Sequence, residues 1–394
     1  MPSAPTTSLD LTDPAVVADP YPFFARERAE HAVAWHEQSG SFLTFSHAAV
    51  SAVQRDRRLG RLWTDREPAQ RLEPFNLLHR NQMMENEPPE HTRLRRPVAS
   101  AFSRGHVERL RPRVRELASG LLAEVSGAEG FDVVAAYAEP LPVLVIAELL
   151  GVPASHAGDL RDWSQAIVRM YEPRPSEAVV DAAVRASEDF AALVRDLVAV
   201  RRRTPADDLV TDLAATELSD DEVVAAVVLL LNAGHEASVN VFGNGLVAML
   251  RRGLRPGVDV PACVEEMLRF DSALQLFERT ATEPVELPGG VLVEPGQKVS
   301  ALLGAANRDP AVFERPDELV VDRSPNPHLA FGVGVHFCLG APLARMELAE
   351  SVALLWERFP GLALAGEPES RGTFVLRGHH RVPVRDEPHG ERES

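Results

Sequence analysis

One cysteine in a glycine-rich segment is the residue whose surroundings point most clearly to chemistry. Residues 331–340 read FGVGVHFCLG, and a helix-forming run, residues 344–359, follows at once. The glycines of this segment, of which Gly340 is the last, let the backbone come close around the sulfur and tolerate positive φ. Backbone N–H groups and the N-terminus of the next helix can then stabilise a thiolate. We expect Cys338 to be a metal-ligating thiolate shielded by the ring of Phe331; the alternative is a buried structural cysteine.

A second chemical pattern lies in the middle of a long apolar segment, residues 219–250. The segment begins with SDDE, a capping-box sequence that starts a helix, and continues with apolar residues on nearly every face. Its middle, residues 233–238, reads AGHEAS and combines small residues such as Gly234 with an acid, Glu236, and a hydroxyl, Ser238. This pattern indicates either a site for a small ligand against a buried helix or close packing of another element.

The cysteine segment resembles the haem-binding loop of the cytochrome P450 family in its bacterial soluble form. The resemblance extends over most of the chain. Residues 266–269 read EMLR and look like the family's Glu-x-x-Arg motif. Residues 307–310, NRDP, and the region up to Arg323 resemble the segment that leads to the haem loop, and residues 87–95, EPPEHTRLR, resemble the start of a helix on the cysteine side of the haem. The resemblance implies a haem-thiolate monooxygenase that holds haem b (iron protoporphyrin IX) through Cys338.

The resemblance also implies which side chains hold the porphyrin. Its two propionates need cationic or hydrogen-bonding partners where they are partly buried. By similarity these are His336 in the loop, Arg279, and His91 with Arg95, which lie four residues apart on one helical face. Each of them alone could instead be a surface charge or an ordinary core histidine.

The Glu-x-x-Arg residues are expected to be structural. Glu266 and Arg269 lie three apart on a helix, so they can pair with each other. In the family they also pair with another arginine, which is Arg323 by similarity, and together brace the fold near the haem loop.

In the family, the segment that corresponds to AGHEAS passes over the haem. It contains an acid followed by a threonine, and the threonine hydroxyl steers protons to the oxygen site. Here Glu236 keeps the acid, but the threonine position is Ala237. The arrangement resembles that of the bacterial macrolactone hydroxylases that make erythromycin-type antibiotics. Ser238 lies about 100° further round the helix and can face away. We therefore expect proton delivery assisted by a substrate hydroxyl, with Glu236 feeding protons through water; the alternative is a relay through Ser238.

An arginine cluster interrupts an otherwise acidic chain. Between residues 93 and 116 only Glu108 and Glu116 oppose the positive charges. The cluster is either a solvated helix face or a docking surface for an acidic electron donor, and the resemblance places it on the cysteine side of the haem. Because the sequence shows no flavin-binding or iron–sulfur motif, a separate ferredoxin and ferredoxin reductase are the expected partners. The cluster consists of Arg93, Arg95, Arg96, Arg104, Arg109, Arg111, Arg113 and Arg115.

The lining of the substrate pocket follows only from the resemblance. Methionines would provide an adaptable apolar wall, although every position could equally be plain core. The expected lining is Met83, Met84, Leu231, Leu274, Gln275, Leu276, Phe277, Thr373, Phe374 and Val375.

Composition limits the setting in which these residues act. The 394 residues are 45% hydrophobic and 25% charged, which is ordinary for a globular protein that can enclose a cofactor. The formal net charge of −17 argues against nucleic acid and anionic membranes as partners. No run of 18 apolar residues or signal-peptide core is present, so we expect no membrane span. With Cys263 and Cys338 as the only cysteines, a disulfide framework is not expected and the cytoplasm is the simplest location.

Helical periodicity dominates the elements that must position these residues. The expected fold is mainly α with small β-sheets: a single cytochrome P450 domain over residues 1–394, with the haem between the long central helix and the cysteine-loop helix and with short polar tails at about 1–10 and 386–394. Residues 319–333 are expected to be irregular coil. Helices are expected over residues 104–125, 178–203, 219–250 and 261–270, and strands over 33–45 and 280–301.

The sequence therefore favours a monooxygenase that hydroxylates or epoxidises a hydrophobic secondary metabolite, such as a macrolide-, polyketide- or peptide-like compound of antibiotic biosynthesis, with O2. Two alternatives stay open. One is a haem-thiolate oxidase that couples or rearranges its substrate without inserting oxygen. The other is a haem protein that binds ligands or senses gas without turnover.

Overall fold

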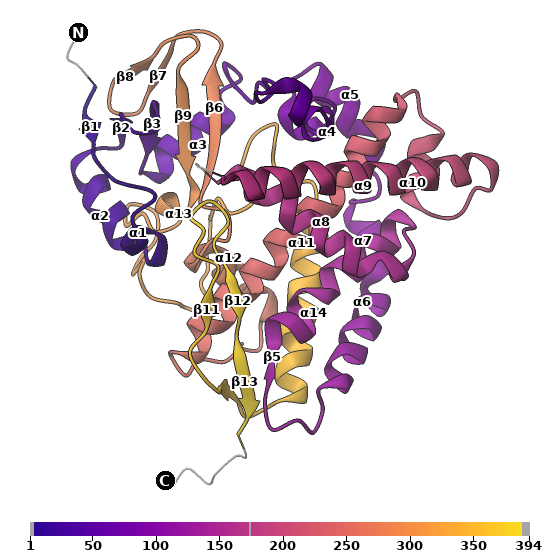
Figure 1. Cartoon of the computed structure of the whole chain (residues 1–394). Coiled ribbons are helices and arrows are strands. Elements are labelled where there is room, and N and C mark those ends of the chain that lie inside the picture. The colour runs from indigo at the N-terminus through magenta and orange to yellow at the C-terminus, as the bar shows by residue number, and fades with distance from the viewer. Residues whose placement is uncertain (1–3, 173–174, 388–394) are drawn as a thin grey trace, which may run out of the picture.

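Helices form most of the chain, as the sequence predicts (Figure 1). The computed structural model describes residues 4–172 and 175–387. The helices are α1 (Pro14–Ala18), α2 (Tyr21–Glu30), α3 (His47–Arg55), α4 (Ala69–Arg80), α5 (Glu90–Ala99), α6 (Arg104–Glu124), α7 (Pro140–Leu150), α8 (Ala157–Val168), α9 (Glu177–Arg203), α10 (Leu209–Ala214), α11 (Asp220–Leu250), α12 (Val260–Phe270), α13 (Leu303–Ala306) and α14 (Ala341–Arg358). Short 3₁₀ helices are η1 (Met83–Glu85), η3 (Ala154–His156) and η4 (Arg169–Tyr171), and η2 (Val134–Ala138) is a π-helical segment.

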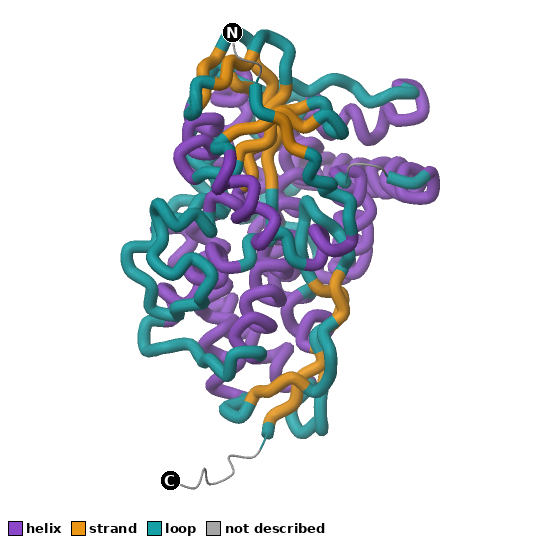
Figure 2. Tube along the Cα trace, turned by 90° about the vertical axis from the view of Figure 1, so that its left-hand side faces the viewer, coloured by secondary structure: helices purple, strands orange, loops and turns teal. Residues whose placement is uncertain are grey.

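Strands gather mainly at one end of the molecule, with a smaller group near the C-terminus (Figure 2). They are β1 (Thr6–Thr7), β2 (Val33–His36), β3 (Ser41–Thr44), β4 (Leu59–Gly60), β5 (Phe131–Asp132), β6 (Leu276–Ala281), β7 (Val285–Leu287), β8 (Val291–Val293), β9 (Lys298–Leu302), β10 (Leu362–Leu364), β11 (Glu369–Ser370), β12 (His379–Arg381) and β13 (Pro383–Asp386). The largest sheet has the order β1-β2-β3-β9-β6-β4. Within it β9 lies between β3, to which it is parallel, and β6, to which it is antiparallel.

The N-terminal segment is not the polar tail that the sequence suggested for residues 1–10. Thr6 and Thr7 pair in parallel with Trp35 and His36 of β2. Leu9 is buried with the side chains of α1 and α2 because it packs into the core beside the main sheet. Of the tails expected at both ends, residues 1–3 and 388–394 lie outside the described residues.

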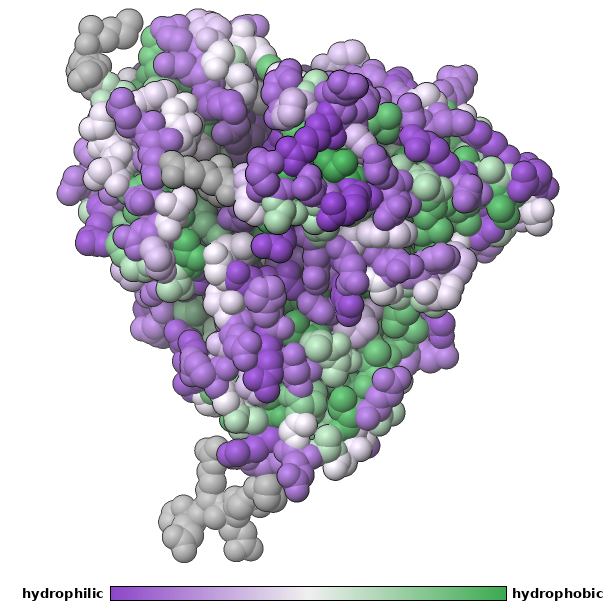
Figure 3. Space-filling model, viewed as in Figure 1, coloured by the Kyte–Doolittle hydropathy of each residue, from purple (hydrophilic) through white to green (hydrophobic). Residues whose placement is uncertain are grey.

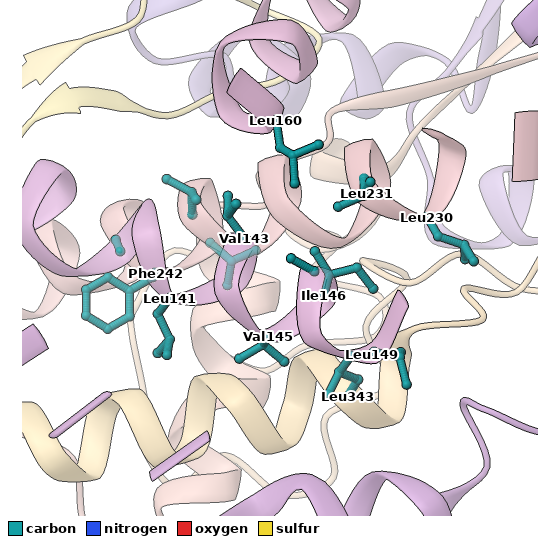
Figure 4. Close-up of a cluster of buried hydrophobic side chains, with 14 of the residues drawn as sticks. Leu141, Val143, Val145, Ile146, Leu149, Leu160, Leu230, Leu231, Phe242 and Leu343 are labelled. Carbon is teal, nitrogen blue, oxygen red and sulfur yellow. The ribbon is translucent and has the colours of Figure 1, made fainter. Parts of the chain in front are cut away.

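Helix α11 is the central element. The Ser219 hydroxyl accepts the amide of Glu222, whose carboxylate accepts the amide of Ser219 in return, so the expected capping box starts the helix. Its side chains meet α7, α8 and α14 in one hydrophobic cluster, where Leu231 lies near Ile146 and Leu160 (Figure 4). The near-continuous apolar sequence of α11 is therefore used for packing on several sides at once.

By length and composition alone, α11 could cross a membrane. Its most apolar window has a mean hydropathy of 1.4, but 78% of that window is buried inside the protein. A helix enclosed in this way has its apolar side chains covered by other helices, as in the core helix of a globular protein. The visible face of the molecule in Figure 3 is mostly hydrophilic, with smaller hydrophobic areas between.

Helices α12 and α14 connect this core to the cysteine segment. Helix α14 begins directly after Gly340 and packs against α6 on one side and α12 on the other. Residues 319–333 run without helix or strand toward the start of α14, as expected from their prolines. The cysteine segment is therefore held between the end of this coil and the first turn of a buried helix.

Candidate active site

The cysteine segment forms a tight loop closed by its own backbone. The amide of Cys338 donates to the carbonyl oxygen of Phe331 at 3.0 Å. Gly332 and Gly334 have φ values of +66° and +80°, and a Cβ at position 334 would lie 2.3 Å from the carbonyl oxygen of Gln54. Only glycine fits there. The third glycine of the segment, Gly340, has φ −78° instead and caps α14, so its conformation does not require glycine.

Backbone amides surround the thiol of Cys338. The N–H groups of Gly340 and Ala341, at the start of α14, donate toward its sulfur and stabilise the thiolate together with the charges of Arg95 and Arg345. Burial is the larger effect, so the pKa of the free thiol still lies above its ordinary value. Ionising the buried thiol without a partner is costly, but hydrogen-bond donors stand ready for the thiolate. This environment suits a thiolate that binds a metal cation, because the cation shares its negative charge.

Cys263 offers a contrast. Its side chain is fully buried on α12, 3.7 Å from the sulfur of Met249, and burial raises the pKa of its thiol to about 12. Cys338 by comparison is partly accessible. Of the two cysteines, only Cys338 is not fully buried.

Two of the residues expected to hold propionates, His91 and His336, lie side by side. The rings of His91 and His336 are 4.6 Å apart, and His336 Nε2 lies 2.8 Å from Glu87 Oε1. Both ring nitrogens of His91 are buried without a hydrogen-bond partner among the described residues. Burial and the neighbouring charges lower the pKa of His91 to about 4. A buried polar group without a partner costs free energy, so His91 is a donor in need of an acceptor.

Arg279 on β6 is also a buried donor, and among the described residues it has no acidic partner at hydrogen-bond distance. Its side chain is buried, and its hydrogen bond is to the carbonyl oxygen of Glu278, at 3.0 Å. Burial, with the nearby charge of Arg61, lowers the pKa of Arg279 to about 9. Glu85, which could have neutralised it, is bound by Arg61 instead. A buried guanidinium short of a counter-ion favours an anionic ligand.

Arg95 makes its hydrogen bonds to the backbone of the cysteine loop. Its guanidinium donates to the carbonyl oxygens of Phe337, at 2.8 Å, and Val335, at 3.4 Å. Arg95 therefore ties α5 to the cysteine loop and places a positive charge near Cys338.

The middle of α11 has one open face. Ala233 is exposed and Ala237 is half-buried, while almost every other residue of this helix is buried. The two alanines are four residues apart and share a face, so open space lies against them. Gly234 is beside this face, and a Cβ there would lie 3.3 Å from Ile146 of α7, which indicates close helix packing at that position.

Glu236 lies on another side of α11, in a buried polar cluster. Its Oε2 is 3.0 Å from Nη1 of Arg371, whose Nη2 is 3.1 Å from Glu139 Oε1. Its Oε1 has no hydrogen bond and lies 3.4 Å from Nδ1 of His235. Burial raises the pKa of Glu236, and the Arg371 charge opposes that rise. The carboxyl is therefore poised to take up or release a proton.

Ser238 does not share the open face. It is buried and lines a small cavity of about 10 Å³ between α7, α11 and α14, together with Tyr137 and Glu347. Burial alone raises the pKa of Glu347 to about 8. Ser238 and a second buried acid thus line the same cavity, and Ser238 is about 100° round the helix from Ala237.

The Glu-x-x-Arg residues form a fully buried bidentate pair. Arg269 reaches the two carboxylate oxygens of Glu266 at 2.7 and 2.8 Å, and Arg323 Nε lies 3.0 Å from Glu266 Oε2. Arg269 also donates to the carbonyl oxygens of Asn307, Pro316 and Glu318. These contacts tie α12 to the coil that leads to the cysteine loop.

The residues expected to line the pocket divide into a partly exposed group and a buried group. Residues 274–277 and 373–376 lie side by side, because the amide of Gln275 donates to the carbonyl oxygen of Val375. The partly exposed members are Met84, Leu274, Leu276, Phe277 and Thr373. The members buried in core packing or in hydrogen bonds are Met83, Leu231, Gln275, Phe374 and Val375.

The arginine cluster is less positive than its sequence suggests. Acids from distant segments neutralise it: Glu222 pairs with Arg93, Glu350 with Arg111 and Arg115, and Glu148 with Arg113. The members that are exposed and form no ion pair within 4 Å in the described part of the chain are Arg96, Arg104 and Arg109. The pKa of Glu108 is nevertheless lowered by its hydrogen bond from Arg111 and also by the nearby charge of Arg104.

Two buried groups of the site, Arg371 and Glu347, were not expected from the sequence. Arg371 is 135 residues from its partner Glu236, and no local pattern links the two. Glu347 follows the cysteine by nine residues, on a helix whose other acids are exposed or paired. A glutamate between apolar residues in a buried helix was the available signal for it.

Comparisons with known proteins agree with this geometry. The family model described as Cytochrome P450 matches residues 260–369. Nocardicin C N-oxygenase of Nocardia uniformis subsp. tsuyamanensis is 39% identical over 96% of this chain and 98% of its own. Mycinamicin IV hydroxylase/epoxidase of Micromonospora griseorubida is 38% identical over 87% and 89%. The crystal structure of P450BioI in complex with an acyl carrier protein ligated to hexadec-9Z-enoic acid superposes with a TM-score of 0.90, at 31% identity over 95% of this chain and all of that one.

Proposed function

The chain belongs to the cytochrome P450 family and is a haem-thiolate monooxygenase, and we propose that Cys338 supplies the thiolate in an enzyme that oxidises a secondary metabolite. In this proposal residues 1–394 act as one haem-binding domain.

The residues present fit the haem. A propionate would give His91 the acceptor that its two unpartnered nitrogens lack, and it would give the buried Arg279 a counter-ion. His336 stands beside His91 and is the third candidate donor. The thiol of Cys338, toward which the amides of Gly340 and Ala341 donate, suits an iron ligand, and Phe331, whose carbonyl oxygen accepts the Cys338 amide, is its proposed aromatic shield. Arg95 supports the loop through its backbone carbonyls and is the fourth proposed partner of the propionates.

When bound, the haem supplies the iron at which molecular oxygen is activated with electrons and protons. The protein's part is to hold a substrate over it and to bring protons to the right side. Ala233 and Ala237 leave room against the middle of α11, whereas Gly234 packs closely against Ile146 of α7. Glu236 is the proton source, because its raised pKa and its unpartnered Oε1 let it hold a proton and pass it to water.

The last proton transfer uses a hydroxyl or carbonyl on the substrate. The position after Glu236 is Ala237, which has no hydroxyl, and Ser238 points into the cavity with Glu347 rather than to the open face. The substrate therefore carries a hydroxyl or carbonyl close to the carbon that is oxidised. The test compares the true substrate with its deoxy analogue: wild type couples electrons to product with the first and makes mostly peroxide with the second. Equal coupling with both, combined with a collapse in Ser238→Ala, would show that the protein carries its own relay.

The substrate is a hydrophobic secondary metabolite of macrolide, polyketide or peptide type, which the enzyme hydroxylates or epoxidises. Support comes from relatives whose names specify nocardicin C and mycinamicin IV as substrates. The proposed pocket lining is Met84, Leu274, Leu276, Phe277 and Thr373, which are partly exposed, and Phe277 also lies beside Arg279.

Electrons come one at a time from a separate ferredoxin, itself reduced by a ferredoxin reductase. The exposed Arg96, Arg104 and Arg109 support docking of an acidic partner near the α5 side of the cysteine loop. The cytoplasm is the proposed location, in keeping with two free thiols in the described chain.

The observation that carries this proposal is the loop of Cys338, in which two backbone amides donate toward the sulfur of a residue that is only partly buried. The deciding experiment is turnover of a substrate under ¹⁸O₂ with a ferredoxin system. A monooxygenase leaves one labelled atom in the product. A product without label, formed while substrate is consumed, would favour coupling or rearrangement. Candidate substrates are found by screening for compounds that shift the Soret band on binding.

A further inference from the structure

A cluster of three charged or polar side chains lies on the α12 side of the cysteine loop, outside the residues discussed so far. Glu265 of α12 accepts two hydrogen bonds from Arg345 of α14, with Nε–Oε1 at 2.6 Å and Nη2–Oε2 at 2.9 Å. His328, from the coil before the loop, places its Nε2 2.9 Å from Glu265 Oε2. The cluster therefore joins the three segments that meet around Cys338.

The hydrogen bonds determine the protonation of His328 and Glu265. The amide of Ala330 donates to Nδ1 of His328 at 3.2 Å, so the ring proton sits on Nε2 and points at Glu265. Burial opposes ionisation of Glu265, but the hydrogen bonds from His328 and Arg345 outweigh it and hold the pKa of that carboxyl well below its ordinary value. His328 is 2% exposed, so its ring is held in one position by its surroundings.

Arg345 is thereby held against the aromatic shield of the cysteine. Its guanidinium carbon lies 4.5 Å from the centroid of the Phe331 ring, within the range of a cation–π contact. The carbonyl oxygen of Phe331 accepts the amide of Cys338, so the residue under the guanidinium is also bonded to the cysteine backbone. The positive charge of Arg345 is close enough to stabilise a negative charge on the Cys338 sulfur.

We propose that Glu265, His328 and Arg345 are positioning residues that hold the charge of Arg345 against the cysteine loop and so raise the reduction potential of the haem iron. The proposal rests on the ligand assignment made above. A cation near a thiolate withdraws electron density from the sulfur, and a weaker electron donor favours the reduced iron. Glu265 has a second effect of opposite sign, because its own negative charge partly compensates that of Arg345.

Solvent reduces the size of the effect of Arg345 on the reduction potential but does not change its sign. The side chain of Arg345 is 40% exposed, so part of its field is screened. If the cluster only braced the loop mechanically, loss of Glu265 and loss of Arg345 would change the reduction potential in the same direction. An electrostatic device responds in opposite directions: Arg345→Gln removes the cation and lowers the potential, whereas Glu265→Gln leaves the cation on Phe331, removes the anion and raises it.

The test is a potentiometric titration of the haem-loaded protein. We compare wild type with Arg345→Gln, Arg345→Lys, Glu265→Gln and His328→Gln, and use Arg358→Gln as the control. Arg358 is exposed at the far end of the same helix and bonds to Ser126, so its loss removes an equal charge away from the loop. We expect a lower potential in Arg345→Gln, a smaller change in Arg345→Lys, a higher potential in Glu265→Gln and no shift in Arg358→Gln.

Other results would overturn the proposal. Shifts of the same sign in Arg345→Gln and Glu265→Gln would make the cluster a structural brace. An unchanged potential with slower reduction by ferredoxin would make Arg345 a docking residue. The red-shifted Soret band of the reduced carbon monoxide complex is recorded for every variant. If the variants keep that band and have the same potential as wild type, this inference fails and the Cys338 assignment stands. If wild type itself lacks the band, the Cys338 assignment fails.

Discussion

Arg371 bridges two carboxylates from different elements, with Nη1 3.0 Å from Glu236 of α11 and Nη2 3.1 Å from Glu139, which precedes α7. The acid of the central helix is therefore anchored on one oxygen and unpartnered on the other. This arrangement holds the Glu236 carboxyl in place and leaves one buried oxygen without a hydrogen bond among the described residues.

Replacing Glu236 by Gln is expected to uncouple electron use from product formation, because an amide cannot supply the proton. Positioned proton donors contribute about 10²–10⁴-fold, so product formation should fall by at least about 10-fold while peroxide rises. Product and peroxide are measured per electron consumed. Glu367→Gln, which removes an exposed carboxylate paired with Arg251, is the control. Unchanged coupling in Glu236→Gln would exclude this acid as the proton source.

Removing a proposed propionate partner is expected to weaken haem binding. His91→Ala and Arg279→Ala each delete a buried donor, and hydrogen bonds to charged groups contribute about 1.5–3 kcal/mol. Haem transfer to an apo-globin acceptor should therefore speed up about 10- to 100-fold. Arg58→Ala, which removes an exposed arginine paired with Asp56, should not change it. Normal haem retention in both buried variants would contradict the assignment.

Glu347 is expected to make folding stability depend on pH. Its pKa of about 8 in the folded protein lies above the value of 4.5 for an exposed glutamate, so the native state holds an extra proton between these pH values. Stability relative to Glu347→Gln should therefore fall as pH rises from about 5 to 8, by no more than about 1.4 kcal/mol per unit, and then level off.

Denaturant unfolding of both proteins at several pH values measures this difference. Glu357→Gln, an exposed change on the same helix, is the matched control and should run parallel to wild type. A constant difference between wild type and Glu347→Gln would show that Glu347 is not held neutral by burial.

The arginine cluster is expected to act through its unpaired members. Reversing Arg96, Arg104 and Arg109 to Glu should slow reduction by ferredoxin about 10-fold or more at low salt and flatten its salt dependence, because opposite charges steer encounter. Substrate binding should stay nearly unchanged. Arg113→Glu, at an arginine already paired with Glu116 and Glu148, should slow reduction less. Equal reduction rates in all variants would return the cluster to a solvated helix face.

Much of the fold could be predicted because its helices are strongly periodic. The expected segment 104–125 differs by one residue from α6, and the segment 178–203 differs by one from α9. Helix α7 was not predicted, since its sequence PLPVLVIAELL is apolar on every side and shows no helical period. The N-terminal strand was also missed, because two threonines carry no strand signal without their partners on β2.

The site was less predictable than the fold for a related reason. Cys338, His91 and Glu236 stand in local motifs, and local motifs are visible in one sequence. Which side of α11 each residue faces, and which distant acids neutralise Arg111 and Arg115, depend on contacts between elements far apart in the chain. The same holds for Arg371 and for the cluster of Glu265, His328 and Arg345.

The most direct test of the account concerns the axial ligand. The spectrum of the reduced protein with carbon monoxide should show the red-shifted Soret band of a thiolate-ligated haem. Cys338→Ser should lose that band, and Cys263→Ser, which changes a thiol buried against Met249, should keep it. Loss of the band in Cys263→Ser with retention in Cys338→Ser would contradict the central claim.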